Sequence, residues 1–180
     1  MNMDFSLKKQ IFNKLLDSKY KYFTLDLLTA KYYKYDRNLN IFLAFTSSGS
    51  VAGWAIWKEI PWLWGIIIIA SQLVIVLKPY FPFSKYSKEF SEKYVLLQSL
   101  VNELEQFYLK IHLKKITEEQ AIEDFFKIKH EIESSLNFSN ENDFNVNKRM
   151  KKKAEHRMKI YLKTNYNKDL SNYQKISNNE

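Results

Sequence analysis

The feature that most constrains this chain is an apolar block in its first half. Residues 41–57 and residues 61–77 each run for 17 positions without a charged side chain, and only Lys58 and Glu59 carry charge between them. At 1.5 Å per residue, a helix of that length covers about 25 Å, close to the ~30 Å hydrocarbon core of a bilayer. Because the connection is so short, the block predicts an antiparallel transmembrane hairpin over residues 41–78.

Aromatic and basic residues flank the block as they flank membrane helices. All four Trp lie between positions 54 and 64, around the expected turn, where an interfacial aromatic belt would place them. Residues 1–40 hold eight Lys or Arg, whereas the turn has only Lys58. The positive-inside rule therefore predicts that both termini lie in the cytoplasm. A buried helical hairpin in a soluble protein is the alternative, and the Trp belt argues against it.

The two predicted spans differ in character. The second is rich in Ile and Val and is expected to face lipid. The first has small and hydroxylated side chains, including a GxxxG spacing that lets two helices approach closely. Helix packing needs only that close contact, whereas a pore would place the hydroxyls on water, and both alternatives stay open. The candidate pore-lining or helix-packing residues are Thr46, Ser47, Gly49, Ser50 and Gly53.

The polar remainder of the chain is expected to be helical, which makes the fold class all-α. With three Gly and three Pro in 180 residues, the composition favours long helices. Residues 1–40 are expected to form amphipathic cytoplasmic helices, residues 79–166 a cytoplasmic helical bundle, and residues 167–180 a disordered tail. Thr117 and Gln120 form a capping-box pattern that opens one helix of the bundle.

A long helix predicted over about residues 84–115 carries a heptad pattern. Its apolar positions are spaced alternately four and three residues apart, as in a coiled coil. Such a seam packs either inside one subunit or between subunits, and we favour self-association into a homo-oligomer. The seam residues are Phe90, Tyr94, Leu97, Val101, Leu104, Tyr108 and Ile111.

Positive charge is concentrated near the C-terminus. Residues 145–168 hold nine Lys or Arg and one Glu, while the other residues hold 19 of each sign. The pattern predicts a basic helix over about residues 148–166. Three surroundings fit this helix: RNA or another polyanion, the anionic inner leaflet, or water alone, with its charge balanced by acidic helices. The candidate polyanion-binding residues are Lys148, Lys151, Lys152, Lys153 and Arg157.

The side-chain inventory excludes several kinds of catalytic site. Cysteine is absent, the three His share no metal-ligand spacing, and all three Gly lie in the apolar block, so no phosphate-binding loop exists. We therefore expect no metal, no cofactor and no small-molecule substrate. One candidate catalytic pair remains. Arg149 and His156 are seven positions apart and share a helix face, where Arg can stabilise phosphate charge and His can transfer protons in RNA cleavage.

The order of a two-span hairpin, a long helix and a basic helical end resembles that of bacterial antiphage membrane effectors. One such family comprises the two-transmembrane effectors of nucleotide second-messenger defence. Another comprises the small membrane accessory proteins of type VI-B CRISPR systems, divergent members of the HEPN class. The HEPN motif is an Arg followed after four to six residues by a His, and Arg149 and His156 match its longest spacing. Met150 is a departure, since active HEPN ribonucleases usually carry a polar residue there.

The resemblance implies an oligomeric pore or membrane-perturbing assembly in the bacterial inner membrane. Such an assembly would enhance RNA-guided antiphage defence by depolarising the membrane, with lipid and RNA or an RNA-guided nuclease as partners. One alternative is a membrane-tethered HEPN-like ribonuclease or RNA-binding protein that uses Arg149 and His156. Another is a scaffold that holds a partner at the membrane and conducts no ions. We favour the non-enzymatic effector.

Overall fold

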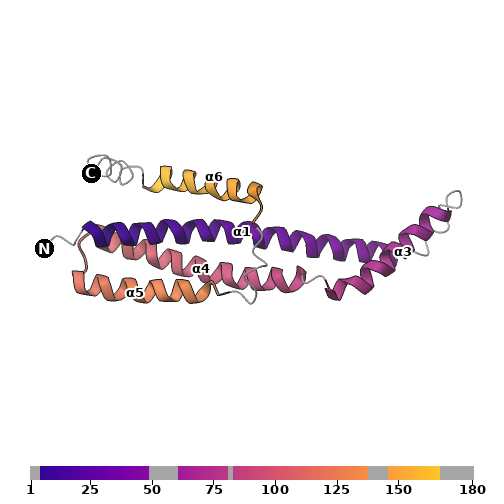
Figure 1. The fold of residues 1–180 in the computed structure, drawn as a ribbon, viewed down its shortest axis with the longest axis horizontal. Coiled ribbons are helices and arrows are strands. Elements are labelled where there is room, and N and C mark those ends of the chain that lie inside the picture. Colours follow the sequence, from indigo (N-terminus) through magenta and orange to yellow (C-terminus); the bar gives the residue numbers. More distant parts are fainter. Residues whose placement is uncertain (1–4, 49–60, 81–82, 138–145, 167–180) are drawn as a thin grey trace. The chain divides into compact units, whose positions relative to one another are not determined.

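The computed structural model describes residues 5–48, 61–80, 83–137 and 146–166, and these ranges are helical apart from short connections. The prediction of an all-α helical bundle is confirmed for this part of the chain. The predicted disordered tail, residues 167–180, lies outside the described residues. Figure 1 shows the elements: α1 (Phe5–Ser48), α3 (Pro61–Leu77), the 3-10 turn η1 (Lys78–Tyr80), α4 (Phe83–His112), α5 (Glu118–Ser135) and α6 (Lys148–Asn165).

The chain divides into two compact units. Unit 1 combines Met1–Leu28 with Ser91–Glu180, and unit 2 is Thr29–Phe90. Helices α1 and α4 each contribute to both units, because neither helix is interrupted at the boundary. The amphipathic pattern before the apolar block therefore belongs to one long helix, α1, which continues into the predicted first span.

Unit 1 is a bundle in which parts of α1, α4, α5 and α6 share one apolar core. Ion pairs that join its helices include Lys14 with Glu133 at 2.8 Å and Lys19 with Glu105 at 2.7 Å. Truncating a buried Leu or Ile in such a core to Ala costs about 2–5 kcal/mol. The core includes Ile11, Leu15, Leu25, Leu28, Leu97, Leu104, Tyr108 and Ile132, each less than 2 % exposed.

The predicted heptad seam of α4 lies inside the single chain. Six of its seven residues are buried, and Tyr94 is half-buried with its hydroxyl 2.9 Å from that of Tyr22. This burial corrects our expectation that the seam joins subunits. The alternating spacing marks an apolar helix face, and helices of the same chain cover that face first because they are already tethered to it. Self-association stays a prediction, and it requires another surface.

The turn between α4 and α5 is held by local hydrogen bonds. Thr117 Oγ1 accepts from the Gln120 backbone N–H, and Gln120 Oε1 accepts from the Thr117 backbone N–H, both at 3.3 Å, so the predicted capping box is confirmed. Lys114 has φ 52°, the left-handed conformation that usually falls to Gly after a helix end. The α4–α5 connection therefore stores a small backbone strain at Lys114.

Unit 2 contains the described part of the predicted hairpin. An aromatic cluster of Tyr32, Tyr35, Phe83, Tyr86 and Phe90 holds the start of α4 against α1. The second predicted span coincides with α3, whereas the first is described only as far as residue 48, and residues 49–60 lie outside the described ranges. Within the described helices, none is both long enough and apolar enough to cross a membrane.

Candidate functional site

The candidate site is the outer surface of α6, the most basic helix of unit 1. Asn147 caps its start, because its side-chain oxygen accepts a hydrogen bond from the Met150 backbone N–H at 2.9 Å. Such a cap satisfies one of the N–H groups that a helix start leaves open. The helix has eight Lys or Arg and one acid, Glu155. It begins at Lys148 and ends at Asn165, so the predicted basic helix is confirmed.

A narrow inward face attaches α6 to the bundle. Met150 and Ala154 are buried, and Tyr161 is half-buried. Arg157, beside this face, forms an ion pair with Asp26 of α1. Because Ala154 has no exposed surface, a larger side chain at this position would force α6 away from its neighbours.

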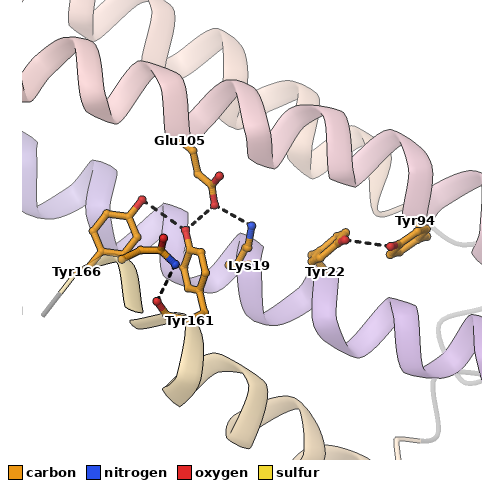
Figure 2. A network of polar contacts seen from close by, with 7 residues as sticks. Lys19, Tyr22, Tyr94, Glu105, Tyr161 and Tyr166 are labelled. Atoms are coloured by element: carbon orange, nitrogen blue, oxygen red, sulfur yellow. Dashed lines mark hydrogen bonds and ion pairs between the residues drawn. The ribbon is translucent and has the colours of Figure 1, made fainter. Parts of the chain in front are cut away.

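Glu105 of α4 is the centre of a polar network that fixes the C-terminal end of α6. Its Oε1 accepts hydrogen bonds from Lys19 Nζ at 2.7 Å and from the Tyr161 hydroxyl at 2.5 Å, as Figure 2 shows. Lys19 Nζ also lies 4.6 Å from the centre of the Tyr161 ring, within the range of a cation–π interaction. The Tyr161 hydroxyl lies 3.4 Å from that of Tyr166. One carboxylate therefore connects α1, α4 and α6.

Burial raises the pKa of two phenols in this region. The pKa of Tyr161 is raised above its usual value, first because burial disfavours the phenolate and second because the hydroxyl donates to Glu105. The pKa of Tyr22 is raised in the same way, by burial and by its hydrogen bond with Tyr94. Tyr161 acts as a hydrogen-bond donor to the Glu105 carboxylate, and the raised pKa of both phenols matters only in alkaline solution.

The outward face of α6 forms a line of basic residues that we call the basic stripe. Its members recur every three or four positions, and at about 100° per residue they lie opposite Met150 and Ala154. The line covers about 21 Å of helix, a length suited to contacting several phosphates in a row. The basic stripe consists of Arg149, Lys152, His156, Lys159 and Lys163, all of them exposed.

The five predicted polyanion-binding residues are all exposed on α6, but they differ in what they contact. Arg157 is engaged by Asp26, so it ties α6 to the bundle. Lys152 belongs to the basic stripe, and Lys148, Lys151 and Lys153 flank it. Within the described ranges these four lysines have no acidic partner. Four of the five predicted cations are thus available to an anionic partner.

The predicted catalytic pair, Arg149 and His156, also lies on the basic stripe. Two helical turns separate them, about 10.5 Å along the axis. In the described part of the chain, neither side chain has a hydrogen-bond partner that would orient it. A catalytic base is ordinarily held in place by a third group. The described structure thus places both side chains on one exposed face of α6, and the catalytic and anion-binding roles of this pair both stay predictions.

Thr46 is the predicted pore-lining or packing residue whose side chain the structure describes. Its hydroxyl donates to the carbonyl oxygens of Phe42 and Leu43 in its own helix, both at 3.1 Å. The hydroxyl is therefore satisfied without water or a second helix. Ser47 belongs to α1, but its side chain is outside the description, and Gly49, Ser50 and Gly53 lie outside the described residues.

Sequence reasoning missed Lys19 and Glu105 as the residues that hold α6 in place. They are 86 positions apart, and the residues next to them in the sequence do not distinguish them from charged residues that stay in water. The residue that could have indicated this contact is Tyr161, which places a hydroxyl on the narrow apolar stripe of the basic helix. A buried Tyr hydroxyl usually has a hydrogen-bond partner.

Other kinds of functional centre find no support in the described residues. No group of three or more His, Asp or Glu in these ranges is placed to hold a metal ion. Comparison with protein-family models, curated proteins and solved structures gave no match for the chain. The case for a function therefore depends on the chemistry of its own surfaces.

Proposed function

We propose that this protein is a membrane effector whose unit 2 inserts into a bilayer and whose copies assemble into a pore or membrane-perturbing element. The observation that carries the proposal is the exposure of large apolar side chains on α3. Ile66, Ile69, Leu73 and Val76 are each more than half exposed. A contiguous apolar surface is unfavourable in water and favourable in hydrocarbon, and it marks a site of membrane or protein contact.

The hydrogen bonding of polar side chains in unit 2 is also compatible with insertion of this unit into a bilayer. The Ser71 hydroxyl donates to the Ile68 carbonyl at 2.8 Å, as Thr46 does to Phe42. A hydroxyl that is bonded to its own helix does not add an unsatisfied polar group to the hydrocarbon region. Lys78 Nζ donates to Asn40 Oδ1 at 3.0 Å and joins the residues that flank the two uncharged segments. This contact supports a hairpin in which the start of the first segment and the end of the second lie at the same depth in the bilayer.

The length of α3 bears on the mode of action. Its 17 residues cover about 25 Å, somewhat less than the ~30 Å hydrocarbon core. A short apolar segment is accommodated by local thinning of the bilayer or by association of several copies. Both responses are compatible with an assembly that perturbs the membrane.

The more specific part of the proposal is antiphage defence at the bacterial inner membrane. In this proposal both termini are cytoplasmic, and the assembly depolarises the membrane when RNA is sensed. The order of the predicted elements, which resembles that of antiphage membrane effectors, supports it. The basic stripe supports it too, because its Lys and Arg residues present the charge that RNA or an RNA-guided nuclease complex would contact. No chemical step is required of the protein itself.

A liposome assay with two matched variants tests the proposal. Ile69→Lys and Phe126→Lys each replace a large apolar side chain that is more than half exposed, and only Ile69 lies on α3. A lysine deep in a bilayer costs about 2.5–3.5 kcal/mol, so we expect Ile69→Lys to lower liposome binding and ion leakage more than tenfold. Phe126→Lys should leave both unchanged.

Three results would contradict the proposal. If both variants behave alike, α3 is not the inserting element. If the parent binds liposomes without changing their ion permeability, the scaffold is favoured. If purified parent protein cleaves RNA and His156→Ala does not, the ribonuclease is favoured. Ion leakage that persists in His156→Ala, with no RNA cleavage by the parent, would exclude the ribonuclease.

A further inference from the structure

Positive charge is concentrated in unit 2 beside the ends of its uncharged segments. Residues 29–40 and residues 78–90 together hold six Lys or Arg and two acidic residues, whereas residues 41–48 and residues 61–77 hold no charged side chain. Five of the six cations are exposed, and within the described ranges none of the five forms an ion pair. We call these five residues the basic cluster: Lys34, Arg37, Lys78, Lys85 and Lys88.

Contacts inside unit 2 bring the two basic stretches of the chain together. The Lys78 ammonium donates to Asn40 Oδ1 at 3.0 Å, which joins the end of α3 to α1. The centre of the Phe83 ring lies 6.4 Å from that of Tyr32 and 5.6 Å from that of Tyr35, which places the start of α4 against α1. Cations from α1, η1 and α4 therefore lie in one region, next to the apolar surface of α3.

The chain itself determines how deep the basic cluster lies once α3 is inserted, and in this respect the inference rests on the proposed function. Lys78 directly follows Leu77, the last residue of α3. Arg37 and Lys34 precede residue 41, where the first uncharged segment begins, by four and seven positions, or about 6 Å and 10.5 Å along α1. The headgroup layer is about 5–8 Å thick on each side, and charges act over about 8 Å at physiological ionic strength. These cations therefore reach the headgroups wherever unit 1 lies.

Exposed tyrosines accompany the cations. Tyr33, Tyr35 and Tyr80 are 57 %, 46 % and 78 % exposed. A phenol combines an apolar ring with a polar hydroxyl, and Tyr is enriched where membrane proteins cross the headgroup layer. Cations without acidic partners beside exposed phenols are the side chains that this layer favours.

We propose that the basic cluster binds the phosphate groups of anionic phospholipids in the leaflet that unit 2 enters. Lys and Arg donate charge-assisted hydrogen bonds to phosphate oxygens. Exposed aromatic rings beside cations also suit single-stranded RNA. Continuity with the apolar surface of α3 selects lipid, because the space directly beside Lys78 is occupied by headgroups when α3 lies in the bilayer. The contact makes insertion depend on anionic lipid and holds the hairpin at one depth.

Partition of the full chain onto vesicles, measured by flotation after dilution from mild detergent, tests the contact. The vesicles contain either phosphatidylcholine alone or phosphatidylcholine with phosphatidylglycerol, which is anionic. Lys34→Gln with Arg37→Gln is compared with Arg149→Gln with Lys152→Gln, because each pair removes one Lys and one Arg, three positions apart, from an exposed helix surface. Each cation near an anionic surface strengthens binding about fivefold, so the first pair should lower partition onto anionic vesicles roughly 25-fold.

The parent is expected to prefer anionic vesicles, and the second pair should behave as the parent does. On neutral vesicles both pairs should match the parent, and circular dichroism should show unchanged helicity, since Gln forms helices nearly as well as Lys and Arg. Equal partition of the parent onto both kinds of vesicle would overturn the headgroup contact and leave insertion standing. Equal losses in the two pairs would also overturn it. A first pair that loses binding to single-stranded RNA but keeps the parent's partition would make RNA the ligand of the cluster. Failure of the parent to bind either kind of vesicle would instead overturn the proposed function.

Discussion

Replacing Glu105 by alanine tests how firmly the basic helix is held on the bundle. The change removes the acceptor of two hydrogen bonds and leaves the Lys19 ammonium, on a side chain that is 12 % exposed, without its counter-charge. A hydrogen bond to a charged group contributes about 1.5–3 kcal/mol. The Glu105 side chain is itself 26 % exposed, so water can enter, and we take the lower end for each bond. The expected loss in the free energy of unfolding is therefore about 3 kcal/mol.

Urea and thermal unfolding of the full chain in mild detergent, followed by far-ultraviolet circular dichroism, measure this loss. For a chain of this size, about 3 kcal/mol lowers the thermal midpoint by roughly 6–12 °C. Glu105→Gln is the control, because it keeps an acceptor oxygen and the side-chain shape while removing the charge. We expect it to cost about 1 kcal/mol.

A double-mutant cycle with Tyr161→Phe decides whether the network is the cause. The two residues share one hydrogen bond, so the double variant should lose less stability than the sum of the single losses, by about 0.5–2 kcal/mol. Strictly additive losses would refute the reasoning. So would a loss in Glu105→Ala that is no larger than the loss in Glu105→Gln.

Three further predictions concern stability. Ser18 is fully buried, and its hydroxyl has no hydrogen-bond partner in the described structure, so Ser18→Ala should raise the free energy of unfolding by about 1 kcal/mol; a lower urea midpoint would contradict this. Lys114→Gly should stabilise the chain by about 0.5–1 kcal/mol, because Gly tolerates the positive φ at this position. Lys114→Ala keeps the backbone strain and should leave the urea midpoint unchanged. Finally, the raised pKa values of Tyr161 and Tyr22 mean that the folded chain keeps protons that the unfolded chain releases above about pH 10. Stability should therefore be fully present below that pH and fall above it, and Tyr161→Phe should flatten the fall; equal slopes in parent and variant would refute this assignment.

Local patterns accounted for most of the secondary structure. The capping box at Thr117 depends on residues three positions apart, and the basic helix depends on a run of helix-forming residues, so both were visible without any tertiary contact. The apolar spacing on α4 likewise identified a face that must be covered. Thr46 was ambiguous, because a hydroxyl in an apolar helix can bond to its own backbone as well as to water or a partner.

The sequence by itself determined which segments are helical, where the apolar block lies and where positive charge is concentrated, because periodicity and composition act over a few turns. Tertiary structure alone decided which neighbour covers each face. It placed the α4 seam inside the chain, and it paired Lys19 with Glu105 over 86 positions and Arg157 with Asp26 over 131. Such pairs form only after packing brings distant helices together, and no local pattern distinguishes the Lys that gains a buried partner from the Lys that stays in water.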